Sequence, residues 1–168
     1  MLGVSTSSLR FLMHPSSDRL FELLAEAKRI GKEYRELTGR PLGITGEIAE
    51  YEAVRLLGLE LADVRQAGYD AIRRDELSIQ RLQVKGRCIL DRSKRGQRLG
   101  RIDLGKDWDG VLMVLLDADF ESVEIYEADR ETVSNALRVP GSAARERGAL
   151  SVSKFKAIGT RVWSRSES

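Results

Sequence analysis

Three polar side chains of the sequence carry groups that could act together on a phosphate ester. Asp70 ends the segment GYD, and the triplet Gln83-Val84-Lys85 begins thirteen residues later. A carboxylate, an amide oxygen and the backbone carbonyl of Val84 are ligands of the kind that hard divalent cations prefer. A bound metal polarises a phosphoryl oxygen, and a lysine ammonium stabilises the charge that builds on it. These residue types therefore suit metal-assisted hydrolysis of a phosphodiester bond.

These residues are expected to meet across a β-hairpin. Residues 65–72 and 79–89 have the short, partly alternating pattern of strands, and the polar segment between them predicts a turn. With the turn centred near Glu76, opposite residues have numbers that sum to about 153, so Asp70 faces Gln83 on the same side of the sheet. Lys85 lies on that face too, because side chains in a strand alternate between faces.

A helix that precedes the hairpin supplies two more carboxylates. Its pattern spans residues 46–57, with Thr45 as the expected N-cap and Gly58 as the end. Glu47 and Glu50 share one apolar stripe of this helix, so they point toward the protein or toward a cleft in it. Either glutamate could reach the polar patch of the hairpin.

The middle of the chain is strongly polarised in charge. Residues 81–101 carry eight basic side chains and one acidic, whereas residues 102–129 carry one basic and nine acidic. A concentrated basic segment is typical of a surface that binds a polyanion, and the alternative is that the two adjacent segments neutralise each other. The candidate phosphate-binding residues are Arg81, Arg87, Arg92, Lys94, Arg95, Arg98 and Arg101.

The rest of the pattern indicates a mixed α/β or α+β protein. The apolar run Val111–Leu116 is typical of a central strand buried on both faces. The order of elements predicts a mixed sheet of four to five strands flanked by helices. In chain order the expected helices cover residues 18–37, 46–57, 130–137 and 152–158, and the expected strands cover 65–72, 79–89, 111–116, 122–127 and 161–163.

Length and composition bound the possibilities. The 168 residues predict a single domain, with a flexible arm over residues 1–15 and a tail over 164–168. The single cysteine, Cys88, excludes an internal disulfide framework, and the single histidine, His14, excludes a site that needs two histidines. No apolar run is long enough for a membrane span, and no signal peptide is recognised, so we expect a cytoplasmic protein.

Taken together, GYD, a hairpin, an apolar-flanked QVK and a preceding helix with a glutamate resemble the PD-(D/E)xK nuclease superfamily. This is the fold of many restriction endonucleases, Holliday-junction resolvases and repair exonucleases. The resemblance covers residues 44–137 and implies a restriction-endonuclease-like core, with a mixed four-stranded sheet between helices. It also implies Mg²⁺- or Mn²⁺-dependent hydrolysis of phosphodiester bonds in DNA.

The resemblance assigns a role to each residue of the patch. It implies that Asp70 binds the metal, that Gln83 stands at the (D/E) position and that Lys85 is the motif lysine. Glu47 matches the acid that many members carry on the first core helix, and Glu50 is the alternative. The chain departs from the common pattern twice, because Tyr69 stands where many members have proline and Gln83 replaces the usual acid.

Partners and alternatives follow from these roles. One such site cuts one strand, so cleavage of both strands of a duplex predicts a homodimer about a two-fold axis. The neutral Gln83 keeps a second hypothesis open, namely a non-catalytic nucleic-acid-binding module with a degenerate metal site. A third hypothesis is an interaction protein whose acidic residues 102–129 meet a basic partner.

Overall fold

The structure is a computed structural model that describes residues 15–63, 68–91, 96–141 and 143–165. Within these residues one mixed sheet has six strands in the order β1-β2-β3-β4-β5-β6. The strands are β1 (Glu60–Leu61), β2 (Ala71–Arg74), β3 (Ile79–Cys88), β4 (Gly110–Leu116), β5 (Ser122–Asp129) and β6 (Thr160–Ser164), and the helices are α1 (Pro15–Thr38), α2 (Thr45–Leu57), α3 (Arg130–Arg138), α4 (Ala143–Glu146) and α5 (Val152–Ile158).

All neighbouring strands are antiparallel except β3 and β4, which are parallel. Every residue of β4 is buried, which confirms that the run 111–116 is a central strand. The predicted mixed sheet with flanking helices is therefore confirmed, but it has one strand more than the upper end of the expected range. The additional strand is β1, whose two residues are too few to show a period.

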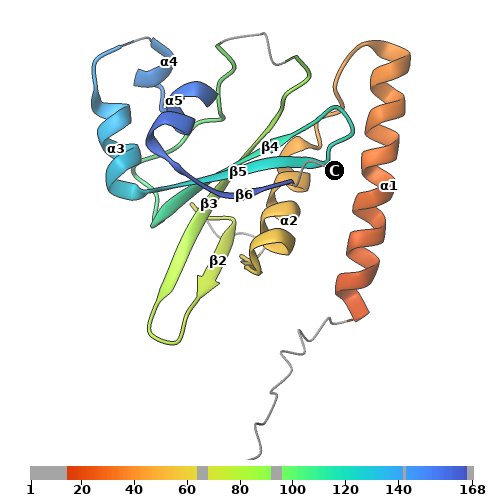
Figure 1. Cartoon of the computed structure of the whole chain (residues 1–168), viewed down its shortest axis with the longest axis horizontal. Helices are drawn as coiled ribbons and strands as arrows, with labels where there is room; N and C mark the ends of the chain where they lie inside the picture. Colours follow the sequence, from red (N-terminus) through yellow and green to blue (C-terminus); the bar gives the residue numbers. More distant parts are fainter. Residues whose placement is uncertain (1–14, 64–67, 92–95, 142, 166–168) are drawn as a thin grey trace, which may run out of the picture.

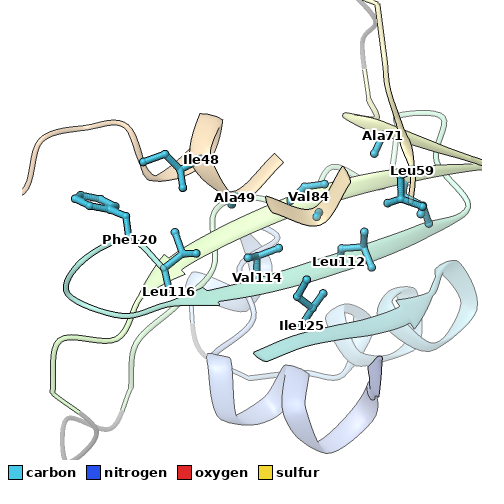
Figure 2. Close-up of a cluster of buried hydrophobic side chains, with 12 residues drawn as sticks. Ile48, Ala49, Leu59, Ala71, Val84, Leu112, Val114, Leu116, Phe120 and Ile125 are labelled. Atoms are coloured by element: carbon cyan, nitrogen blue, oxygen red, sulfur yellow. The ribbon is translucent and has the colours of Figure 1, made fainter. Parts of the chain in front are cut away.

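Two apolar layers enclose the sheet. Helix α2 covers one face (Figure 2), and α3 and α5 cover the other together with part of the β3–β4 connection. Side chains of β4 alternate between the layers, with Leu112 on the α2 side and Met113 on the other. The first layer includes Ile48, Ala49, Ala53, Val84, Val114 and Ile125, and the second includes Trp108, Val111, Leu115, Val133, Leu150 and Phe155.

The β3–β4 connection is fixed by backbone hydrogen bonds across the second layer. The amide of Leu99 donates to the carbonyl of Leu150, and the amide of Ile102 donates to that of Gly148, both at 2.9 Å. Leu99 and Ile102 are themselves buried. Residues 99–102 of the connection therefore lie against the sheet.

Helix α1 stands at the side of the molecule and is fixed to the turn between β4 and β5 (Figure 1). The ring of Phe120 lies under Gly31, where a Cβ would come within 2.9 Å of ring carbon Cε2. The Arg35 guanidinium lies 5.1 Å from the centre of the same ring, and Lys32 pairs with Asp119 at 2.8 Å. No helix in the described part of the chain is long and apolar enough to cross a membrane.

Three local predictions need correction. Helix α2 begins at Thr45 and its cap position is Ile44, because the Thr45 hydroxyl lies 3.8 Å from the Cys88 sulfur instead of closing the helix. The predicted turn after residue 72 starts later, at Asp75, because β2 continues to Arg74 opposite β3. The short helix α4 lies between the expected helices 130–137 and 152–158, where the sequence predicts no helix.

The bounds of other elements also shift. The predicted strand 65–72 is paired only from Ala71, and its residues 65–67 lie outside the described part of the chain. Helix α1 begins at Pro15, inside the predicted arm, whose residues 1–14 lie outside the described part as well. Asp129 caps α3, and its carboxylate accepts a hydrogen bond from the Thr132 amide.

Candidate functional site

The hairpin formed by β2 and β3 has the register that the sequence predicts. The pairs of this ladder, beginning with Ala71 and Leu82, have residue numbers that sum to 153. Asp70 precedes β2 by one residue, and its amide donates to the carbonyl of Leu82 at 2.9 Å, although Leu82 is already paired with Ala71, so the pairing shifts by one residue at Asp70. The predicted register of the hairpin is therefore confirmed from Ala71 onward, whereas the pairing of Asp70 with Gln83 stays a prediction.

The Asp70 side chain turns toward the backbone of β3. Its Oδ2 accepts a hydrogen bond from the Val84 amide at 2.7 Å. In an antiparallel ladder the N–H and C=O of one residue point to the same edge of the strand. The carbonyl of Val84 therefore points to the edge of β3 at which the Asp70 carboxylate lies.

Gln83 is buried on the opposite face of β3 from Val84. Only 7% of Gln83 is exposed, and its Nε2 donates to the Gly68 carbonyl at 3.1 Å. This bond fixes the orientation of the amide, so Oε1 is the other end, and Oε1 is buried without a hydrogen-bond partner among the described residues. A buried acceptor without a partner is costly and marks a place where a ligand or water belongs.

Helix α2 is brought close to this hairpin by Gly86. A Cβ at Gly86 would lie 2.5 Å from the Cβ of Ala49 and 2.8 Å from the carbonyl oxygen of Thr45. Side chains never approach so closely, so only glycine allows this contact between helix and strand. Glu50, the residue after Ala49, is thereby carried to the site by the helix.

The charges of Glu50, Asp70 and Lys85 interact with one another. Burial, with the neighbouring charges of Asp70 and Glu47, raises the pKa of Glu50 to about 7, and Lys85 opposes this shift. Burial lowers the pKa of Lys85, which the charges of Asp70 and Glu50 oppose. Acidic and basic groups that perturb each other while partly buried are a recurring feature of functional sites.

The two candidate glutamates of α2 differ in their surroundings. Glu50 is half-buried and interacts electrostatically with both Asp70 and Lys85, whereas Glu47 is exposed and acts on Glu50. The helix position therefore favours Glu50 as the acid of the site. Within the described residues no group of three or more His, Cys, Asp or Glu side chains is arranged to hold a metal ion.

The β3–β4 connection forms a wall beside these groups, which the sequence did not predict. A Cβ at Gly100 would lie 3.8 Å from Cδ of Lys85. Gly68 has φ +118°, and a Cβ there would lie 2.9 Å from Cβ of Lys106 and 3.1 Å from the Asp107 amide. The glycines were the available signal, since glycine marks places where two backbones approach.

Arg81 is the first predicted phosphate-binding residue, and the structure places it in an ion-pair cluster. Its Nε lies 3.0 Å from Oδ2 of Asp109, and its NH1 pairs with Asp107. The Arg81 side chain and amide hold the pKa of Asp109 below its ordinary value against the effect of burial. Arg81 therefore stabilises the residues at the start of β4, and its guanidinium is already engaged by Asp107 and Asp109.

The other predicted basic residues differ in their availability. Arg87 and Arg98 are exposed, and neither forms an ion pair with the described residues. Arg101 is exposed and lies 3.6 Å from Asp103. The remaining three predicted contacts, Arg92, Lys94 and Arg95, lie outside the described residues.

The acidic segment 102–129 is neutralised mainly by cations from elsewhere in the chain. From the basic segment, Arg81 and Arg101 are the described residues whose ion pairs join the two segments. The other pairs are Asp117 with Arg165, Asp119 with Lys32, Glu121 with Lys28, Glu124 with Lys156 and Arg161, and Glu127 with Arg73. Mutual neutralisation thus accounts for two basic residues and leaves Arg87 and Arg98 unpaired within the described residues.

No protein-family model matches the chain, and no curated protein matches it significantly. Function therefore has to be derived from the geometry and charges of the site itself.

Proposed function

We propose that this protein is a metal-dependent nuclease of the PD-(D/E)xK type that hydrolyses phosphodiester bonds in DNA. The observation that carries the proposal is the mutual interaction of Glu50, Asp70 and Lys85, which come from α2, the start of β2 and β3. Two acids and a lysine at one partly buried place match the needs of phosphodiester hydrolysis. The order of elements, a helix, a hairpin and a buried central strand, supports the same superfamily.

The proposal requires a hard divalent cation such as Mg²⁺ or Mn²⁺, and the chemical types of the oxygen atoms at the site support it. Asp70 and Glu50 would supply the negative charge, and the Val84 carbonyl and the unpartnered Gln83 Oε1 would supply neutral oxygens. Such ions prefer oxygen ligands of these kinds. When bound, the metal would polarise a phosphoryl oxygen and acidify a water molecule.

The protein's own residues contribute positioning and charge. Lys85 is half-buried and interacts electrostatically with both acids, so its ammonium would stabilise the negative charge of the phosphate as it reacts. Gln83 is held by Gly68, and its oxygen can orient a metal or water without adding charge. Glu47, exposed on α2, would act through Glu50 by raising its pKa.

The DNA backbone would be bound next to this site by the basic residues of the β3–β4 region. Arg87 and Arg98 are exposed and form no ion pair with the described residues. Arg101 is also exposed and forms one long ion pair, with Asp103 at 3.6 Å. Salt-dependent binding to phosphates is the expected consequence of such residues. Arg81 is assigned to the fold here, because Asp107 and Asp109 hold its guanidinium.

The test is nicking of a supercoiled plasmid in Mn²⁺, comparing the wild type with Lys85→Ala. Lys154→Ala is the matched control, since Lys154 is also half-buried and forms no ion pair with the described residues. We expect nicking by the wild type and the control and none by Lys85→Ala. Equal nicking by Lys85→Ala would contradict the proposal.

A second candidate is a nucleic-acid-binding module without catalysis on the same fold. Two observations favour it, namely the neutral Gln83 at a position that usually holds an acid and the lack of a third acid grouped with Asp70 and Glu50 among the described residues. This candidate predicts salt-sensitive DNA binding that is the same with and without Mg²⁺. Fluorescence anisotropy on a labelled duplex, with and without the metal, separates it from the nuclease.

A further inference from the structure

Helix α1 carries an apolar stripe that is largely exposed in the described part of the chain. Its members are spaced alternately by three and four residues, and four of them are strongly exposed: Leu23 44%, Ile30 48%, Tyr34 40% and Leu37 80%. Two further members, Leu20 and Ala27, are half-buried. The α1 stripe, as we call this set, consists of Leu20, Leu23, Ala27, Ile30, Tyr34 and Leu37.

The rest of the helix is firmly attached, which fixes the direction of the stripe. Phe21 meets Tyr51 of α2 edge to face with ring centres 6.3 Å apart, and Leu24 packs against the first apolar layer. Lys28 pairs with Glu52 of α2 at 2.9 Å. Because these contacts lie on one side of α1, the α1 stripe is left at the surface beside them.

We propose that the α1 stripe is the contact surface for a second copy of this chain, with the two α1 helices side by side and parallel. Alternating spacings of three and four residues form the seam of a two-stranded coiled coil, in which one stripe fits into another. The same stripe on a second copy is the simplest complement, because a two-fold interface joins one patch to itself.

The charges next to the stripe favour a parallel over an antiparallel arrangement of the two α1 helices. In an antiparallel pair with the stripes fully overlapped, Glu26 would stand opposite Glu33 of the second copy. In a parallel pair Glu26 stands beside Gly31 of the second copy, and Glu33 beside Thr38. The antiparallel pair therefore brings together like charges that the parallel pair keeps apart.

The dimensions of the stripe define the strength of the contact. The stripe is about 25 Å long, and a helix with its side chains is about 10 Å wide, so each copy offers a few hundred Å². This is below the ~800 Å² per partner of stable complexes, so we expect a transient dimer that forms at micromolar concentrations. Rotation about a two-fold axis parallel to α1 leaves the coordinate of every atom along that axis unchanged. The candidate sites of the two copies would therefore lie at the same position along the axis.

The first experiment measures the molar mass by sedimentation from about 5 to about 500 µM, the range that spans such affinities. The wild type should rise from 18.8 kDa toward twice that mass. Ile30→Glu should weaken association at least tenfold, whereas Leu77→Glu, at a 99% exposed leucine away from α1, should behave as the wild type. A wild type that stays monomeric throughout, or a dimer that Ile30→Glu leaves intact, overturns the proposal.

The second experiment tests the orientation by disulfide formation in a Cys88→Ser background. In a parallel pair Leu37→Cys meets the same residue of the second copy and should cross-link on oxidation, while Glu36→Cys, off the stripe, should not. Lack of cross-linking at residue 37 overturns the parallel arrangement. Circular dichroism of each variant confirms that it is folded. No DNA or metal enters either experiment, so failure of the dimer and failure of the nuclease are read separately.

Discussion

Replacing Gly86 by alanine should damage the site through the position of α2. The added Cβ would lie 2.5 Å from the Cβ of Ala49 and 2.8 Å from the Thr45 oxygen. Carbon atoms in contact prefer about 3.5–4.0 Å, so the helix must retreat by roughly 1 Å or more. Overpacking of this kind costs about 1–3 kcal/mol, which for a chain of this size lowers Tm by about 2–12 °C. Glu50 moves with the helix, and a 1 Å misplacement can reduce a rate by about 100-fold.

Two readouts test this reasoning, Tm by calorimetry and plasmid nicking in Mn²⁺. Gly46→Ala is the matched control, because a Cβ at Gly46 of the same helix meets nothing within 4 Å. Combining Gly86→Ala with Ala49→Gly removes the closer contact but not the one with Thr45, so we expect partial recovery. A Gly86→Ala protein with the Tm and the nicking rate of the wild type would refute the idea that close packing of α2 sets the site.

Further predictions concern the buried ion pairs and the basic surface. Glu52→Ala should cost about 3 kcal/mol in urea unfolding, because it leaves a buried ammonium with only one partner, while Glu121→Ala at the exposed partner should cost about 1 kcal/mol or less. Burial alone would raise the pKa of Glu52, but its hydrogen bonds to Arg55 and Lys28 have the larger effect, so the pKa lies below its ordinary value. The wild type should therefore lose its stability advantage over Glu52→Gln as the pH falls through that lowered pKa. Arg87→Ala and Arg98→Ala should each reduce the salt slope of DNA binding by about 0.9, whereas Arg19→Ala on α1 should not.

Local patterns were sufficient to predict most of the fold. β4 is buried on both faces and therefore has a continuous apolar run, whereas β3 shows alternation. Both patterns can be recognised from the residue types alone. The register of the hairpin followed from the centre of its turn. Strand β1 has only two residues, which are too few to show a periodic pattern. The cap of α2 depended on a tertiary contact, between the Thr45 hydroxyl and the Cys88 sulfur, which the local sequence does not show.

The candidate site was predictable only in part for the same physical reason. Asp70, Gln83 and Lys85 lie on one hairpin, so period and register were enough to group them. Choosing Glu50 over Glu47 required the approach of α2 to β3, which Gly86 permits. The commitment of Arg81 to Asp109, 28 residues further along, likewise depends on the fold rather than on the local sequence.

Glu50 offers the sharpest distinction between a functional acid and a structural one. Its pKa is raised to about 7, chiefly by burial and by the charge of Asp70, so its ionised form is disfavoured in the folded protein. The stability of the wild type should therefore decrease as the pH rises from about 4.5 to about 7, where this carboxyl ionises in the folded state. Glu50→Gln removes that charge, so at pH 8 it should raise Tm by a few degrees, since the half-exposed side chain contributes about 1 kcal/mol.

The same substitution should abolish nicking, because it removes one of the two carboxylates that the proposed mechanism assigns to the metal. Loss of activity with a gain of stability is the behaviour expected of a group kept for function. Glu47→Gln, at the exposed acid on the same helix, should change both quantities little, because Glu47 raises the pKa of Glu50 less than burial and Asp70 do. A Glu50→Gln protein that is less stable than the wild type at pH 8, or that still nicks DNA at the wild-type rate, would show that this carboxylate belongs to the fold and not to the chemistry.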